Sequence, residues 1–424
     1  MVKELISLQD NLSEQELDSF VAESLANLDL NGKKVLTVIP DSTRTMPLPV
    51  FYRLLHKYLG NRVQELSYLI ALGTHQPMSD DAIDRMLGRE DSDIPRYKVY
   101  NHHWDDPAQL TEIGWIKRAE VERISGGLFG EDVPVHINKL IYNYDHLLVI
   151  APTFPHEVVG FSGGNKYFFP GISGPEILNF FHWLGAVITN REVIGTKYTP
   201  IREVVDLAAS KITIPRTCFS MVVKGQGLKG IFAGSPEEAW ERAADLSADE
   251  HVRYEDKPFR DVLSVAPTMY EDVWTAGKCM YKLEPVIAKG GRLIIYAPHI
   301  TEVSYTHGNH IDEIGYHVRD YFMKRMEKFS HIPRGVLAHS THVKGSGTWE
   351  DGVETPNVNV VLATSIPEER CRKINLGYMD PNSVDINAFK DREEEGILYV
   401  PKAGEILYRL RDESLKNKKS QEQS

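Results

Sequence analysis

Cysteine is scarce in this sequence: the 424 residues include only Cys218, Cys279 and Cys371. Three thiols so far apart in the chain cannot form a disulfide framework or a cysteine-rich metal site. A bound metal would therefore need nitrogen and oxygen ligands, and the 16 histidines can supply them.

Long apolar runs are also missing. The longest, at residues 147–151 and 293–297, are far shorter than the roughly 20 residues that span a bilayer. The first residues, Met1-Val-Lys-Glu-Leu5, lack the apolar segment of a signal peptide. We therefore expect a cytoplasmic protein without a membrane partner.

Positive charge is outnumbered, with 48 Lys and Arg against 60 Asp and Glu and a formal charge of −12. Nucleic-acid binding needs a basic face, so the charge balance argues against that class of partner. Small anionic substrates respond to local charge and are not excluded. The length predicts two or three domains at about 150 residues each.

Short apolar strands alternate with helices along the chain. Ser13 and Glu16 form a capping-box pattern that predicts a helix start. The remaining pattern predicts a helix at 47–59 and strands at 34–40, 66–72 and 146–151. Such alternation is typical of an α/β domain with a largely parallel sheet.

A second α/β unit is predicted from about residue 258. Its predicted strands are 262–266, 292–297 and 358–364, and its predicted helices are 275–289, 311–328 and 384–395. We therefore predict domains at 1–257 and 258–410, a disordered tail at 411–424, and an active-site cleft between the two domains.

Polar residues follow three of the predicted strands in the first domain. Asp41 and Arg44 come after the first strand, His75 after the second and His156 after the third. Ligands bind beyond the carboxyl ends of parallel strands, so these side chains are expected to converge. Either histidine alone is adequately explained as a loop residue bonded to backbone. Two together suit a racemase or epimerase, which needs a proton-transferring group on each side of its substrate.

Two glycine-rich segments raise the possibility of nucleotide binding. The G-x-G-x-x-G pattern at 225–230 is followed by Ile231-Phe-Ala-Gly234, and a helix start is indicated only at Ser235-Pro236, so a hairpin turn is favoured. The segment from Gly160 to Lys166 lacks Walker spacing, but its glycines could form a nest for an anion. A dehydrogenase using the first segment, or a phosphotransferase using the second, is therefore an alternative that the spacing disfavours.

Histidines cluster again in the second domain. His307, His310 and His317, and then His339 and His342, could bind a metal by number alone. No carboxylates stand beside them at ligand spacing, so we interpret both segments as loops that face a substrate. Lys278 is predicted to bind an anion at a helix start.

Taken in order, these motifs resemble the nickel-dependent lactate racemase family, whose enzymes carry a nickel-pincer nucleotide. The resemblance covers most of residues 30–300. The matching segments are Asp41-Ser-Thr-Arg44, Gly73-Thr-His75, His156-Glu-Val-Val-Gly-Phe-Ser-Gly-Gly-Asn-Lys166, Pro170-Gly-Ile172 and His182.

The resemblance implies a role for each matching residue. Lys166 would carry the nucleotide through a thioamide, and His182 would complete the nickel coordination. His75 and His156 would transfer protons while hydride leaves C2 of a 2-hydroxy acid and returns to either face. Arg44 and Lys278 would bind the substrate carboxylate. The cofactor-binding set would comprise Lys166, Gly160, Ser162, Gly163, Gly164 and Asp41, and proteins of cofactor biosynthesis would be partners.

The sequence departs from the lactate enzymes near the expected substrate. Asn165 and Tyr167 flank the lysine where those enzymes have Arg and Ser, and Thr275 replaces a Gln. The segment carrying Tyr305 and His307 is polar, which suits a hydroxylated substrate. We therefore predict a 2-epimerase of a sugar acid such as D-gluconate, with Thr275, Tyr305 and His307 at the substrate. Lactate racemase and a non-catalytic binding relative are the alternatives.

Overall fold

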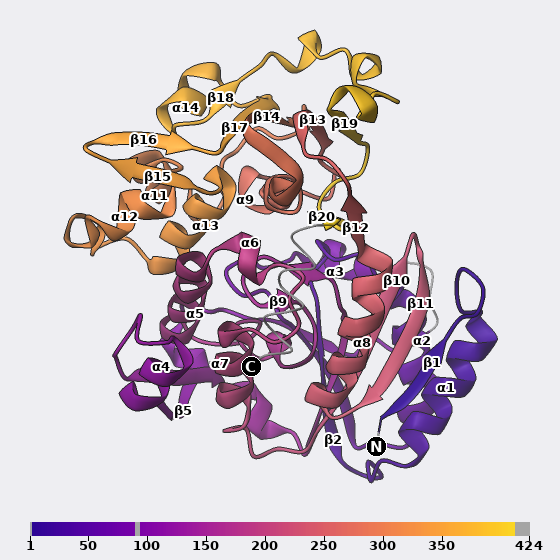
Figure 1. The fold of residues 1–424 in the computed structure, drawn as a ribbon. Coiled ribbons are helices and arrows are strands. Elements are labelled where there is room, and N and C mark those ends of the chain that lie inside the picture. Colours follow the sequence, from indigo (N-terminus) through magenta and orange to yellow (C-terminus); the bar gives the residue numbers. More distant parts are fainter. Residues whose placement is uncertain (1, 90–93, 412–424) are drawn as a thin grey trace. The chain divides into compact units, whose positions relative to one another are not determined.

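The computed structural model describes residues 2–89 and 94–411 (Figure 1), and the chain divides into two compact units. Unit 1 comprises the chain up to Phe154 together with Phe161–Phe181 and Lys197–Glu250. Unit 2 comprises Pro155–Gly160, His182–Thr196 and the chain from His251. The domain boundary near residue 257 stays a prediction, and the predicted tail after Arg411 lies outside the described residues.

Unit 1 is built on a seven-stranded sheet with the strand order β1-β11-β10-β7-β2-β3-β4. The strands from β10 to β4 run parallel, and β11 pairs antiparallel with both β1 and β10. The strands are β1 Lys3–Ile6, β2 Lys34–Ile39, β3 Glu65–Ile70, β4 Lys98–Asn101, β7 His146–Pro152, β10 Arg216–Lys224 and β11 Gly227–Gly234.

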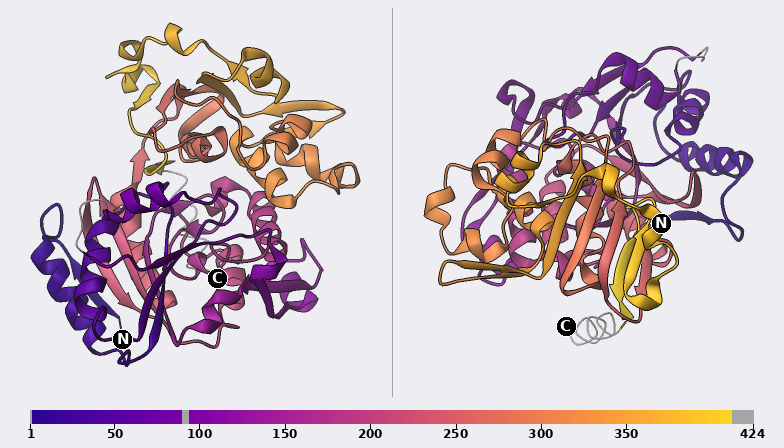
Figure 2. Two further views of the ribbon diagram at one scale, coloured as in Figure 1. Left: turned by 180° about the vertical axis from the view of Figure 1, so that it is seen from behind. Right: turned by 90° about the horizontal axis from the view of Figure 1, so that it is seen from above.

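Helices cover both faces of this sheet. Side chains of α1, α2 and α3 share one apolar cluster with β2 and β3, and Figure 2 shows α1 and α2 in front when unit 1 is seen from behind. Figure 1 shows α8 in front in the opposite view. The helices are α1 Glu14–Ala26, α2 Leu48–Leu59, α3 Asp80–Leu87, α4 Arg118–Ile124, α5 Pro175–Ile188, α7 Pro200–Ala209 and α8 Pro236–His251, and a side hairpin joins β5 Leu110–Ile116 to β6 Val133–Asn138.

Unit 2 contains a five-stranded parallel sheet with the order β18-β17-β14-β13-β19. Its strands are β13 Phe259–Val265, β14 Ile287–Ala297, β17 Val358–Thr364, β18 Gly377–Tyr378 and β19 Ile397–Val400. Its helices are α6 Asn190–Val193, α9 Val273–Ala276, α10 Lys278–Tyr281, α11 Gly308–Ile314, α12 Arg319–Met323, α13 Arg334–Lys344 and α14 Glu368–Lys373. Both units therefore confirm the predicted α/β class with largely parallel sheets.

The remaining elements are short. Paired strands are β8 Pro155–His156, β9 Gly160–Phe161, β12 Val252–Glu255, β15 Gly347–Glu350, β16 Val353–Pro356 and β20 Leu407–Leu410. The 3-10 helices are η1 Pro107–Gln109, η2 Lys139–Asn143, η3 Gly164–Tyr167, η4 Glu284–Val286, η5 Met326–Phe329, η6 Pro381–Ser383, η7 Ile386–Phe389 and η8 Glu393–Glu395. Within the described ranges, no helix combines the length and apolar character needed to cross a membrane.

Of three long helices predicted in unit 2, two are helical only in part and the third is absent. The segment 275–289 is helical in α9 and α10 but does not continue beyond α10, where Pro285 in η4 cannot donate the backbone hydrogen bond of a longer helix. The segment 311–328 breaks at Gly315, whose φ of 71° ends α11. The segment 384–395 forms only 3-10 turns, in which the Asp385 side chain accepts a hydrogen bond from the Asn387 N–H and so competes with a helix.

The segment with His339 and His342 also differs from the sequence-based interpretation. It lies in α13 and not in a loop. The helix ends at Gly345, whose φ is 82°. Its histidines are therefore held on a regular backbone three residues apart.

The G-x-G-x-x-G segment forms a hairpin, as predicted. It connects β10 to β11, Gly225 occupies the left-handed region with a φ of 61°, and α8 begins only at Pro236. No helix opens within the glycines, so they lack the helix N-terminus that binds a pyrophosphate.

Gly225→Ala tests the hairpin interpretation. A Cβ at this position would meet no atom within 4 Å, so the cost comes from the backbone conformation alone. We expect the free energy of unfolding to fall by about 1–2 kcal/mol in a denaturant titration. Gly225→Asn should cost less, because Asn tolerates this region better than Ala. Equal stability of the wild type and the Ala variant would contradict the turn geometry.

Candidate active site

The ends of β2 and β3 form a hydrogen-bonded cluster in unit 1. His75 Nδ1 lies 2.5 Å from Asp41 Oδ2, and Asp41 Oδ1 accepts hydrogen bonds from the Thr43 backbone N–H at 3.0 Å and hydroxyl at 2.6 Å. β2 and β3 are parallel neighbours, with Ile39 opposite Ile70, so the two chain segments leave the sheet at the same edge. Asp41 and His75 therefore meet as the sequence predicted.

The buried carboxyl of Asp41 is held ionised. Burial alone would raise its pKa, but the charges of His75 and Arg44 and the hydrogen bonds from His75 and Thr43 outweigh burial and keep the pKa well below its usual range. The charged His75 ring carries a proton on both nitrogens; when the ring is neutral, a carboxylate that accepts its Nδ1–H leaves the other nitrogen, Nε2, as the proton acceptor.

The glycine-rich loop is buried except at its lysine. Of the fully described residues 158–174, Lys166 alone has a half-buried rather than a buried side chain. It lies in η3, which follows Gly163 and begins at Gly164, with φ values of 94° and 57° for these glycines. A Cβ on Gly163 would lie 2.4 Å from Thr153 Oγ1, and one on Gly164 would lie 2.8 Å from Trp240 Cβ. The loop therefore needs glycine for both its conformation and its close packing.

Side chains behind the loop fix its backbone. The Arg202 guanidinium donates to the carbonyl oxygens of Phe161 and Gly163 and stacks 3.9 Å from the Trp240 ring, whose Nε1–H donates to the Ser162 carbonyl at 3.0 Å. Ser162 Oγ accepts from the Phe154 N–H at 2.9 Å. The serine hydroxyl predicted to bind a cofactor is thus also part of the loop's internal bonding.

The loop reaches the strand-end cluster. The Gly73 N–H, at the end of β3, donates to the Gly171 carbonyl at 3.0 Å. The buried Tyr167 hydroxyl is close enough to Arg44 and Asp41 to feel their charges, although burial is the main cause that raises its pKa. Unit 1 therefore brings Arg44, His75 and the loop that carries Lys166 into one neighbourhood.

His156 is held differently from His75. It is buried in β8, where its Nδ1 accepts the Val158 N–H at 3.1 Å and lies 3.3 Å from Glu157 Oε2. A ring nitrogen that accepts a backbone N–H carries no proton, so in the neutral ring the proton is on Nε2. His156 belongs to unit 2 and His75 to unit 1.

An aromatic stack in unit 2 connects the predicted substrate residues. The Trp274 ring lies 4.5 Å from the His307 ring and 3.8 Å from the His339 ring, with a 22° angle to the latter. Lys278, the first residue of α10, lies 4.5 Å from the centre of the Tyr270 ring. Gly277 just before it has no side chain, which leaves room for His339 Cε1, 3.2 Å from where a Cβ would stand.

His339 and His342 are buried, and burial is the main cause that lowers the pKa of each. The nearby His342, His307 and His182 lower the pKa of His339 further. His182 is half-buried on α5. His182, His307 and His339 therefore share one neighbourhood in unit 2.

The positions of Thr275 and Tyr305 neither support nor exclude the predicted contact with a substrate. The Thr275 hydroxyl donates to Asp272 Oδ1 at 2.8 Å as part of the α9 cap, and the Tyr305 side chain is exposed. Sequence reasoning missed Trp274 and Asp272. Trp274 could have been found from the sequence, because it directly precedes the predicted substrate residue Thr275. In the chain as described, no three His, Cys, Asp or Glu side chains are grouped in a way that could hold a metal ion.

Comparisons with known proteins agree on one family. The lactate racemase N-terminal domain family matches residues 10–195. A curated lactate racemase from Thermoanaerobacterium thermosaccharolyticum is 23% identical over 303 residues, which cover 69% of this chain and 67% of that protein.

Two solved structures share the fold. A crystal structure of a Thermotoga maritima protein has a TM-score of 0.88 and 34% identity, over 96% of this chain and all of that chain. The lactate racemase apoprotein from Thermoanaerobacterium thermosaccharolyticum has a TM-score of 0.69 and 18% identity, over 94% of each chain.

Asp41→Asn tests the buried carboxylate through the pH dependence of stability. The folded-state pKa of Asp41 is depressed, so its stabilisation is complete above the unfolded-state pKa of about 3.9 and is lost as pH falls through the folded-state pKa. We expect the variant to lose about 1–3 kcal/mol at pH 7 in urea unfolding, with the gap to wild type closing below about pH 4. The exposed Asp249→Asn is the control, and a gap that is independent of pH would count against this account.

Proposed function

We propose that this chain, which belongs to the lactate racemase family and is an isomerase of the racemase type, inverts C2 of a 2-hydroxy acid larger and more polar than lactate. The proposal rests chiefly on the two histidines. The neutral His75 ring has its Nδ1 on a carboxylate and presents Nε2 as a proton acceptor, whereas the neutral His156 ring has its Nδ1 on a backbone N–H and presents an Nε2–H group. Inversion at a hydroxyl-bearing carbon requires two proton-transferring groups, and two imidazoles held in opposite tautomers are suited to these roles.

A nickel-pincer nucleotide is the cofactor that we propose, and the residues present fit it. Lys166 has the only side chain in the stretch 158–174 that is not buried, so its amine can be reached for covalent attachment, and the loop before it is held rigidly by Arg202 and Trp240. His182 would supply a nitrogen ligand to the nickel. When bound, this group would accept the hydride from C2 and return it.

The chain's own residues would bind the acid and move its hydroxyl proton. Arg44 and Lys278 would each supply a positive charge to the substrate carboxylate. His75 Nε2 would take the hydroxyl proton of one enantiomer, and Asp41 would stabilise the imidazolium that results. To return a proton when the opposite enantiomer forms, His156 would have to be protonated at Nδ1 as well as at Nε2, and Glu157, 3.3 Å from Nδ1, would stabilise that charged ring before the proton leaves it.

The substrate's size is inferred from unit 2. The Trp274 ring contacts the His307 and His339 rings, so polar ring nitrogens lie beside an apolar surface. The exposed Tyr305 is close to His307 in the sequence. A three-carbon acid would use little of this surface, whereas an aldonate such as D-gluconate has hydroxyl groups that could pair with it. Lactate is the second candidate, because the curated relative is a lactate racemase. The dehydrogenase alternative loses its support, since its glycine motif is a hairpin.

A panel of 2-hydroxy acids tests the substrate. We expect kcat/KM for inversion of D-gluconate to exceed that for either lactate enantiomer at least tenfold, measured by chiral chromatography with cofactor-loaded enzyme. Reactions run in D2O should give product without deuterium at C2, because the hydrogen returns as hydride. Lactate as the best substrate would overturn the polar-substrate proposal, and deuterium at C2 would overturn the hydride route.

Intact-mass spectrometry tests the attachment site. Protein co-expressed with the cofactor-biosynthesis proteins should carry a covalent adduct and about one nickel per chain. Lys166→Ala should lose the adduct and all detectable activity, whereas the control Lys289→Ala, at an exposed lysine, should keep both. An adduct that persists in Lys166→Ala, or full activity of that variant, would contradict the assignment.

A further inference from the structure

Two buried nitrogen atoms on α13 are not accounted for by the roles proposed so far. His339 and His342 stand three residues apart, so both side chains lie on one face of the helix. The two residues are only 8% and 4% exposed, and within the described part of the chain neither Nε2 atom has a hydrogen-bond partner. Buried polar atoms in folded proteins are almost always paired, so two neighbouring exceptions point to a partner that the chain itself does not supply.

The two rings are held in place by aromatic contacts. His339 stacks on Trp274 and meets the Tyr316 ring edge-on at 5.8 Å, and His342 meets the Tyr281 ring edge-on at 6.2 Å. Such contacts set ring orientation without using the ring nitrogens. The Nε2 atoms are therefore fixed in position before any ligand binds.

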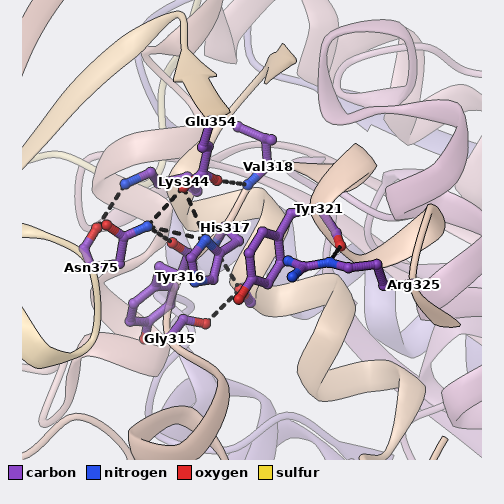
Figure 3. Close-up of polar contacts among 10 residues, drawn as sticks. Gly315, Tyr316, His317, Val318, Tyr321, Arg325, Lys344, Glu354 and Asn375 are labelled. Carbon is purple, nitrogen blue, oxygen red and sulfur yellow. Dashed lines mark hydrogen bonds and ion pairs between the residues drawn. The ribbon is translucent and has the colours of Figure 1, made fainter. Parts of the chain in front are cut away.

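A network of hydrogen bonds joins the end of α13 to the segments that carry His317, Glu354 and Asn375 (Figure 3). Glu354 accepts hydrogen bonds from the Val318 N–H at 2.7 Å and from the Asn375 amide at 2.9 Å, and it pairs with His317 Nδ1 at 2.9 Å. The Lys344 ammonium, at the end of α13, donates to the Asn375 carbonyl at 2.7 Å.

This network ties the segment around Tyr316 to the end of α13. The Asn375 amide donates to the Tyr316 carbonyl at 2.9 Å, and the His317 N–H donates to Ser340 Oγ at 3.0 Å, next to His339. These hydrogen bonds hold the backbone that carries the Tyr316 ring, and the Tyr316 ring in turn contacts the His339 ring.

The unpaired nitrogens adjoin the substrate residues of unit 2. Trp274 contacts both His339 and His307, and Gly277, which precedes Lys278, packs against His339. Glu157, the neighbour of His156, is close enough to His342 to affect its pKa. The pair therefore belongs to the same part of unit 2 as the groups proposed to bind the carboxylate and to move the proton.

We propose that His339 and His342 form a subsite that hydrogen-bonds the hydroxyl groups of the substrate chain beyond C2. This inference rests on the proposed function and specifies its substrate class as polyhydroxylated 2-hydroxy acids. A neutral imidazole nitrogen donates or accepts one hydrogen bond, and a hydroxyl group can do either, so each Nε2 can be satisfied by one hydroxyl. The methyl group of lactate would leave both nitrogens unpaired, which is how a site rejects an analogue that lacks a polar group.

Phenylalanine variants separate the nitrogen atoms from the ring shape. His339→Phe and His342→Phe keep an aromatic ring against Trp274 and Tyr281 and remove the nitrogens. With cofactor-loaded enzyme, we expect each variant to raise KM for D-gluconate about tenfold or more and to lower the ratio of gluconate to lactate kcat/KM by at least as much. His339→Gln, which keeps a side-chain donor and acceptor, should recover part of the ratio. His331→Phe, at an exposed histidine, is the control that should not change the ratio.

Thermal unfolding supplies a readout independent of turnover. D-gluconate should raise the midpoint of the wild type and should raise that of the two Phe variants much less. Without ligand, the variants should unfold at or above the wild-type temperature, because each loses a buried unpaired atom. A gluconate shift that persists in both variants, or an equal loss of kcat/KM for gluconate and lactate, would overturn the subsite.

The subsite and the proposed function can fail separately. A wild type that inverts no 2-hydroxy acid overturns the function, while the gluconate-induced shift still decides the subsite. A wild type that inverts gluconate, with Phe variants of unchanged selectivity, overturns the subsite alone.

Discussion

The hydrogen bond between His75 and the buried Asp41 carboxylate is the interaction on which the chemistry proposed for unit 1 depends. It exists because β2 and β3 are parallel neighbours, so the residues that follow them emerge at the same edge of the sheet. A buried carboxylate is costly unless donors surround it, and Thr43 and His75 supply them. The same bond fixes which nitrogen of the neutral His75 ring can accept a proton, so packing and ionisation are linked to the proposed reactivity at this pair.

The glycine-rich loop obeys a second packing constraint. Its glycines are required because Thr153 and Trp240 leave no room for a Cβ, and Arg202 holds the carbonyls of the loop from behind. Rigidity therefore comes from the protein side of the loop and does not need a ligand. A lysine that emerges from such a loop presents its amine from a defined position, which is what attachment of a large cofactor demands.

The sequence predicted the strands and the polar residues at their ends, because buried parallel strands leave a strong local pattern and their carboxyl ends share one edge. It failed where a long helical pattern was interrupted, as at Pro285 and Gly315, and where Asp385 capped a turn. It also missed the aromatic stack, since the contact of Trp274 with His339 joins residues far apart in the chain. Whether a histidine nitrogen is buried and unpaired depends on every neighbour in three dimensions, and no local pattern encodes it.

The distribution of charge within unit 2 predicts which end of the proposed substrate would lie at Lys278 and which at the imidazoles. Burial lowers the pKa of His339 and of His342, so both rings are neutral at physiological pH and attract a carboxylate weakly. Lys278, beside the same stack, is a cation and would bind the carboxylate instead. A substrate with its carboxylate at Lys278 would extend its other carbon atoms toward the imidazoles. Neutral imidazoles suit the hydroxyl-bearing end of such a substrate, because a hydroxyl group needs a hydrogen-bond partner and gains little from a charge.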